Sequence, residues 1–217
     1  MEFKDFLAII PKIKSIIEND SYNGIDFHLK LTPKVRLNFD MSKVTNPKEA
    51  GVLVLFYPKN GKTHIVLMLR SQYKGTHSAQ ISFPGGKKEP SDKNLIYTAL
   101  RESQEEIGIN ASQIESVFPL TDLYIPPSNF WVYPFIGILK STPKFKTNYE
   151  VEELIEISLD DLLKAKIITK QIKTSYLKST DMNCFIFNEF TVWGATAMIL
   201  NEIRELMNYK WVLMNDE

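Results

Sequence analysis

The sequence predicts an α+β fold of the layered kind, in which helices cover a sheet. The first observation is a pair of β-branched runs around a Pro58…Asn60-Gly61 turn, a pattern typical of a hairpin. The second is a change from strand-like to helical periodicity and back. Strand-like runs lie at 51–57, 64–69, 114–119 and 132–139, and helical runs lie at 1–19, 92–107 and 196–207. This order is not a strict βαβ repeat.

Individual helices carry start and stop signals. The apolar spacing of residues 1–19 predicts one or two amphipathic helices interrupted at Pro11. Gly108 is placed to end the central helix in a left-handed conformation. Ser158, followed by two aspartates, predicts a new helix start. Short extended segments are expected at 185–187 and 190–192.

Composition excludes several classes of protein. With 44% hydrophobic and 24% charged residues, the 217-residue chain is neither disordered, collagen-like nor a disulfide scaffold. The 26 basic and 26 acidic residues balance, so we expect no nucleic-acid partner and no anionic membrane. The single Cys184 is expected to be a small buried side chain. The apolar stretch 190–200 is too short to span a bilayer, and no secretory signal is visible, so we expect a cytoplasmic protein.

The chemistry is concentrated in one predicted helix. Glu102, Glu105 and Glu106 stand at i, i+3 and i+4, so a helix places all three carboxylates on one face. Such a row is either a solvated acidic face, with Arg101 paired to Glu105, or a divalent-cation site, because hard ions need clustered oxygen ligands. The glycine turn at 85–86 favours the cation site, since glycine lets a backbone carbonyl approach the ion.

The run Gly86–Ile109 resembles the Nudix box, the Gly…Arg-Glu-x-x-Glu-Glu-x-Gly signature of hydrolases acting on nucleoside diphosphates linked to another moiety. The resemblance implies a layered α/β/α sandwich, with a mixed β-sheet flanked by helices and a catalytic loop-helix-loop. It also implies a single Nudix domain at 26–217, with residues 1–25 as an N-terminal helical extension.

The box departs from the general pattern in three places. Gly86 and Glu102 are 16 positions apart, one more than usual. Asp92 stands at the position where the general box has a mid-loop glutamate, and Ser103 stands where it usually has a bulkier apolar residue. A box with these departures resembles the box of one subfamily, the coenzyme A pyrophosphatases.

Sequence outside the box supports the same subfamily. The similar stretches are 69–71, 77–86, 123–130, 132–137, 193–197 and, more weakly, 28–36. The resemblance implies a metal-dependent hydrolase that splits the pyrophosphate of coenzyme A or its thioesters. Its products would be 4′-phosphopantetheine, or the acyl form, and adenosine 3′,5′-bisphosphate.

The resemblance also implies a role for each residue type. Mg²⁺ or Mn²⁺ is the expected cofactor, and the expected metal-binding residues are Glu102, Glu105, Glu106 and Gly86. Glu102 would also relay the proton of the attacking water, and Arg101 would orient the glutamates. Because a helix cannot surround an ion, a facing acid is expected, with Glu150 first and Glu153 in reserve. The expected catalytic set is therefore Glu102, Glu105, Arg101 and Glu150.

Further residues are expected to bind the substrate. By resemblance they are Arg70, Ser71, His77, Phe83, Gly85, Gly86, Tyr124 and Phe130. Arg70 would bind phosphate, or alternatively pair with a carboxylate. The aromatic residues would stack on adenine or pack against the pantetheine arm, or alternatively belong to the core.

Other functions stay open at this point. A pyrophosphatase of the same fold could act on ADP-ribose or NADH instead of coenzyme A. A non-catalytic nucleotide-binding regulatory domain is the alternative from another class. The terminal helices at 1–19 and 196–207 offer surfaces through which a homodimer could form.

Overall fold

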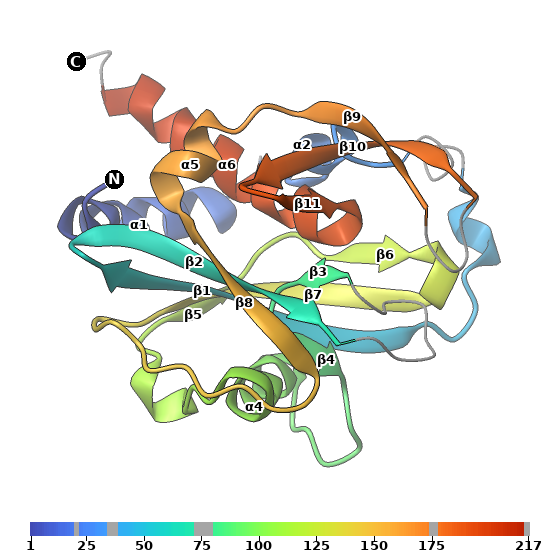
Figure 1. Ribbon diagram of the computed structural model, residues 1–217, viewed down its shortest axis with the longest axis horizontal. Helices are drawn as coiled ribbons and strands as arrows, with labels where there is room; N and C mark the ends of the chain where they lie inside the picture. Colours follow the sequence, from blue (N-terminus) through green and yellow to red (C-terminus); the bar gives the residue numbers. More distant parts are fainter. Residues whose placement is uncertain (20–21, 34–38, 72–79, 174–177, 215–217) are drawn as a thin grey trace.

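The computed structural model describes residues 1–19, 22–33, 39–71, 80–173 and 178–214. A mixed sheet lies at the centre, with one α-helix on one face and the other α-helices and a small sheet on the opposite face (Figure 1). The predicted α+β sandwich is therefore confirmed. Within the described residues, no helix is both long enough and apolar enough to cross a bilayer.

The large sheet has the order β3-β2-β1-β7-β5, with β4 paired to β1, β6 to β7 and β8 to β2. Its strands are β1 Lys48–Lys59, β2 Lys62–Arg70, β3 Ile81–Ser82, β4 Gly85–Lys87, β5 Val117–Pro119, β6 Leu123–Ile125, β7 Phe130–Ile138 and β8 Val151–Ser158. The small sheet is antiparallel, with the order β11-β10-β9. Its strands are β9 Ile168–Ile172, β10 Thr180–Phe187 and β11 Phe190–Trp193.

The helices surround these sheets. The α-helices are α1 Phe3–Ile17, α2 Ile25–Leu29, α4 Leu95–Ile107, α5 Leu159–Lys164 and α6 Gly194–Met214. The 3-10 helices are η1 Met41–Lys43, η2 Ala111–Gln113 and η3 Pro126–Ser128. Figure 1 shows α4 below the large sheet, and α1, α2, α5 and α6 above it with the small sheet.

Strand β1 organises the large sheet. It forms the predicted hairpin with β2, closing at the pair Lys59↔Lys62, and it runs parallel to β7. Its side chains alternate between two cores, as the two-residue period of a strand requires. Leu53 and Leu55 face the core between the sheet and α4, whereas Val54 and Phe56 face the core between the sheet and helices α1 and α6. The sheet is therefore buried on both faces.

Helix α4 begins and ends at residues with defined chemistry. The Asn94 side chain accepts a hydrogen bond from the Tyr97 N–H, so the helix begins three residues later than the periodicity predicted. Gly108 ends it at φ 73°, which confirms the predicted left-handed cap. Buried Ser103 donates to the Ala99 carbonyl at 2.7 Å, so its hydroxyl is satisfied within the helix.

The prediction of a break at Pro11 was wrong. Helix α1 continues through Pro11 from Phe3 to Ile17. The missing proline N–H costs one bond, but Phe6, Ile10 and other apolar side chains of α1 are buried in the core above the sheet. Tertiary packing thus outweighs the local preference.

The division into a 1–25 extension and a 26–217 domain stays a prediction.

Two further expectations about local structure were confirmed. Ser158 caps α5, its side chain accepting from the Asp161 N–H, and Cys184 is fully buried. Four strands were not predicted: β4, β6, β8 and β9. The residues of β9 are almost all exposed, so they carry no apolar alternation.

A buried carboxylate ties the segment before α2 to α6. Glu202 is fully buried, and it accepts hydrogen bonds from the Tyr22 hydroxyl at 2.5 Å and the Thr121 N–H at 3.0 Å. His28 Nε2 lies 2.8 Å from the other Glu202 oxygen. One side chain of α6 therefore connects three segments that are far apart in the sequence.

We predict that Glu202→Ala lowers the free energy of unfolding by about 3 to 5 kcal/mol, because it leaves buried polar partners without an acceptor. Chemical denaturation measures the change. Glu205→Ala on the same helix is the control, since Glu205 forms solvent-accessible ion pairs with Lys30 and Arg204 worth at most about 1 kcal/mol. Equal losses in the two variants would contradict the prediction.

Candidate active site

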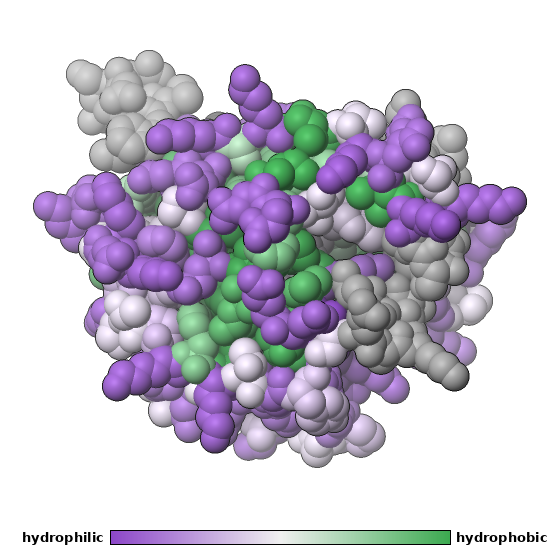
Figure 2. Space-filling view, in the orientation of Figure 1, coloured by the Kyte–Doolittle hydropathy of each residue, from purple (hydrophilic) through white to green (hydrophobic). Residues whose placement is uncertain are grey.

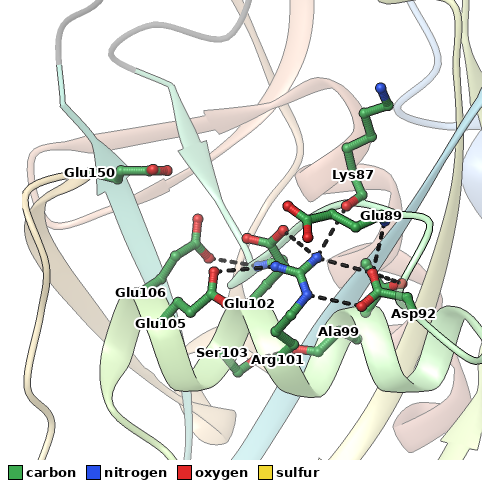
Figure 3. A network of polar contacts seen from close by, with 12 residues as sticks. Lys87, Glu89, Asp92, Ala99, Arg101, Glu102, Ser103, Glu105, Glu106 and Glu150 are labelled. Carbon is green, nitrogen blue, oxygen red and sulfur yellow. Dashed lines mark hydrogen bonds and ion pairs between the residues drawn. The ribbon is translucent and has the colours of Figure 1, made fainter.

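Helix α4 presents a row of glutamates, as its sequence predicted. Glu102, Glu105 and Glu106 rise from the same side of the helix, and Glu150 faces them from the segment before β8 (Figure 3). Their exposure differs: the side chain of Glu105 is 54% exposed, that of Glu102 16% and that of Glu106 2%. The row therefore runs from the solvent into the protein.

Arg101 holds the outer end of this row. Its guanidinium forms ion pairs with Glu102 at 3.0 Å and with Glu105 at 3.2 Å, and it also donates to the Lys87 carbonyl at 3.3 Å. The pairing of Arg101 with Glu105 at i+4 was predicted from the sequence. Each carboxylate thus has a fixed partner that offsets repulsion from its neighbours.

Asp92 fixes the arginine in turn. The two Asp92 oxygens accept from Arg101 Nε and Nη2, both at 3.0 Å, in a bidentate pair. The Thr98 hydroxyl and the Glu89 N–H also donate to Asp92. The Arg101 guanidinium lowers the pKa of Asp92 to about 2, so the carboxylate stays ionised.

A second arginine holds the inner end. Arg70 Nη1 donates to Glu106 at 3.1 Å, and Nη2 donates to Glu150 at 3.4 Å. The Gly85 N–H donates to the other Glu106 oxygen at 2.8 Å. Burial nevertheless raises the pKa of Glu106 to about 8, and burial also raises the pKa of Glu102. Both carboxylates would be ionised more readily beside an added positive charge.

The glycine turn is required by a close approach. A Cβ on Gly86 would lie 2.5 Å from the Glu102 carboxyl carbon, so any side chain here would displace this carboxylate from its present position. The backbone of β4 and the carboxylates of α4 therefore meet, as the sequence predicted.

Glu102 and Glu105 of this row line a large pocket together with Glu150, whereas buried Glu106 does not. The volume of this pocket is about 500 Å³, within the range of sites for small molecules and cofactors. Charged side chains of α4, β2 and the segment before β8 line one end. Apolar side chains of the sheets and α6 line the other end.

The donors present fit a hard divalent cation. The carboxylates of Glu102, Glu105 and Glu106 and the backbone at Gly86 offer oxygen ligands, which Mg²⁺ and Mn²⁺ prefer. The close packing of Glu102 against Gly86 leaves no room for a side chain between them. Among the described residues, no three acidic, His or Cys side chains are grouped as ligands about one point. Each of these carboxylates is instead bonded to an arginine.

The residues expected to bind substrate fall into three groups. Arg70, Phe83 and Phe130 line the pocket together with both glycines. Ser71 and Tyr124 are not among the residues that line it. The Ser71 hydroxyl donates to the Tyr149 carbonyl, and the Tyr124 hydroxyl donates to Asn129. His77 lies outside the described residues, and all of these roles stay predictions.

Sequence reasoning noticed Asp92 only as a departure from the box. The structure shows it as the anchor of Arg101. The signal available was an acidic residue three positions before the first helical residue, which fits many loops. The apolar wall formed by β10, β11 and α6 was missed entirely.

The family follows from this geometry and from comparison with known proteins. The family model described as "NUDIX domain" matches residues 47–177, more than half of the chain. The chain belongs to the Nudix family. The match includes α4, the glycine turn and Glu150.

Two similar proteins show how far the likeness extends. "Nudix hydrolase 15, mitochondrial" of Arabidopsis thaliana is 33% identical over 71% of this chain, which spans 56% of that protein. "Uncharacterized Nudix hydrolase NudL" of Yersinia enterocolitica is 32% identical over 75% of this chain and 83% of its own length.

Solved structures support the fold. A MutT/nudix family protein from Enterococcus faecalis has a TM-score of 0.53 at 11% identity, covering 92% of this chain and 74% of that one. The Nudix hydrolase RenU from M. smegmatis has a TM-score of 0.51 at 15% identity, covering 75% and 87%. At these identities the likeness concerns the fold alone.

We predict that Asp92→Asn destabilises the protein by about 1 to 3 kcal/mol at neutral pH, because a charged hydrogen-bond acceptor is lost. Asp92 has a pKa below its ordinary value, so its contribution is complete above about pH 4 and is lost as pH falls through about 2. The difference between wild type and variant should therefore shrink as pH falls over this range. Urea titration at several pH values measures it.

Exposed Asp181 on β10 provides the control. Asp181→Asn should leave the free energy of unfolding nearly unchanged, as surface substitutions usually do. A wild-type to Asp92→Asn difference that stays constant from about pH 5 to about pH 2 would contradict the assigned ion pair.

Proposed function

We propose that this protein hydrolyses the pyrophosphate bond of coenzyme A or its thioesters. The observation that carries the proposal is a row of carboxylates, fixed by two arginines, of which Glu102 and Glu105 line a pocket of about 500 Å³. The resemblance of 69–71 and 77–86 to the coenzyme A pyrophosphatases supports the substrate. The products would be 4′-phosphopantetheine, or its acyl form, and adenosine 3′,5′-bisphosphate.

The proposed cofactor is Mg²⁺ or Mn²⁺, held by Glu102, Glu105, Glu106 and the Gly86 carbonyl. When bound, such an ion neutralises the diphosphate and makes a water molecule more nucleophilic. The raised pKa of Glu106 supports this arrangement, because a buried carboxylate beside other carboxylates is stabilised in its ionised form by a cation.

The other residues act through position and charge. Arg101, anchored by Asp92, keeps Glu102 and Glu105 oriented. Glu102, half-buried and with a raised pKa, is suited to take the proton of the attacking water. Arg70 lines the pocket beside Glu150, where it can pair with a phosphate oxygen when the glutamates hold an ion.

Glu150 is the proposed facing acid. It lines the pocket and is bonded to Arg70, whereas Glu153 does not line the pocket. Hydrogen bonds hold this segment in place: the Ser71 N–H donates to the Glu150 carbonyl, and the Glu150 N–H donates to the Asn148 side chain. Ser71 thus supports Glu150 through the backbone.

A single experiment tests the proposal. We expect the purified protein with Mg²⁺ to convert coenzyme A into adenosine 3′,5′-bisphosphate, detected by chromatography. The Glu105→Gln/Glu106→Gln variant should lose on the order of 100-fold or more in kcat, because several kcal/mol of charge stabilisation are removed. EDTA should abolish turnover.

Controls separate the substrate from the site. Glu115→Gln, in an exposed pair with Lys140, should retain activity. Faster turnover of ADP-ribose or NADH would overturn the substrate while keeping the metal-dependent reaction. If no compound is turned over, the alternative of a nucleotide-binding regulatory domain replaces the proposal. Light scattering on the same samples tests the predicted homodimer.

A further inference from the structure

The pocket has a second half that the Nudix chemistry does not use. Opposite the charged end, its lining is apolar, and the main contributors are Ile81, Phe130, Met182, Trp193, Ala195 and Ile199. In Figure 2, apolar side chains gather on this face between the large sheet and the layer of α6 and β9–β11, with polar side chains around them.

This apolar half is built between the two sheets. Ile81 lies on β3 and Phe130 on β7, both in the large sheet, while Met182 and Trp193 come from the small sheet. The Thr196 hydroxyl of α6 donates to the Ile81 carbonyl at 2.8 Å, so α6 is bonded directly to β3. Contacts across the sheets thus hold the wall in place.

Four residues of this lining lie outside the region that the family model matches, whereas Ile81 and Phe130 lie inside it. The Nudix match ends at residue 177, whereas Met182, Trp193, Ala195 and Ile199 all follow it. The carboxylate row and Glu150 lie inside the match. The chain therefore supplies this part of the apolar half from its own C-terminal segment, independently of the residues proposed to cleave the diphosphate.

The chemistry of the lining restricts what can bind there. Phe130, Trp193 and Ala195 are only partly buried, so apolar surface faces the pocket. The side chains of Met182, Ala195 and Ile199 offer no hydrogen bonds to replace those that a sugar or nicotinamide would lose with its water. An alkyl chain instead gains up to about fourfold in affinity for each methylene that is fully buried.

We infer that the apolar half, walled by Met182, Trp193, Ala195 and Ile199, binds the alkyl part of an acyl-pantetheine arm and makes the enzyme prefer longer acyl thioesters over short ones. The inference rests on the proposed function, since it assumes that the diphosphate lies at the charged end. Under this inference, the residues that select the length of the acyl chain lie outside the Nudix box.

Ala195→Leu tests this selection. Ala195 lines the apolar half at the start of α6, and the added carbons would occupy the space of several chain methylenes. Steady-state kinetics on acetyl-, hexanoyl- and decanoyl-coenzyme A should show kcat/KM rising with chain length in the wild type, by about tenfold or more overall. In Ala195→Leu, the decanoyl-to-acetyl ratio should fall by about tenfold.

The matched control is Ala8→Leu. Ala8 is exposed on α1, which does not line the pocket, so the decanoyl-to-acetyl ratio should equal that of the wild type. A wild-type ratio near one, or equal ratios in Ala195→Leu and Ala8→Leu, would overturn the inference. Thermal unfolding of each variant shows whether it is folded.

Binding without catalysis separates this inference from the proposed function. Decanoyl-pantetheine has no diphosphate, and we expect calorimetry to detect its binding to the wild-type protein and weaker binding of acetyl-pantetheine. Equal or absent binding of the two compounds refutes the apolar arm site even if coenzyme A is hydrolysed. Selective binding of the decanoyl compound upholds the arm site even if coenzyme A is not turned over.

Discussion

Repulsion between like charges is the constraint on which this site depends. Glu102, Glu105 and the facing Glu150 line the pocket, and Glu106 lies buried behind them on the same face of α4. Two guanidinium groups offset them, and Arg101 is itself held by the buried Asp92. Because Asp92 stays ionised, Arg101 keeps its place when its glutamate partners change their contacts. The row of carboxylates therefore depends on a cation that has its own buried anchor.

The sequence predicted the parts of this site that local periodicity controls. The i, i+3, i+4 spacing placed three glutamates on one face, and the i+4 spacing predicted the pairing of Arg101 with Glu105. The contacts of Arg70 with Glu106 and Glu150 span 36 and 80 residues, and no local pattern reports them. The same holds for Asp92, whose importance comes from its burial and from four donated hydrogen bonds.

In the fold, too, features set by local sequence were predicted, whereas features set by contacts between distant residues were not. The hairpin of β1 and β2 and the left-handed end of α4 at Gly108 are set by residues within one turn, and both were predicted. Pro11 was misjudged because the local cost of a missing N–H is smaller than the gain from burying side chains such as Phe6 on a distant sheet. Strand β9 was missed because pairing with β10, and not apolar burial, holds its exposed residues in place.

Two separate sets of contacts hold the two halves of the pocket. The charged end depends on the arginines and on the passage of β4 beside Glu102. The apolar end depends on the placement of α6, which is fixed by the Thr196 bond to β3 and by buried Glu202 one turn beyond Ile199. Neither set shares a residue with the other. Changes in the C-terminal segment can therefore alter the shape of the apolar end while the acidic row remains as it is.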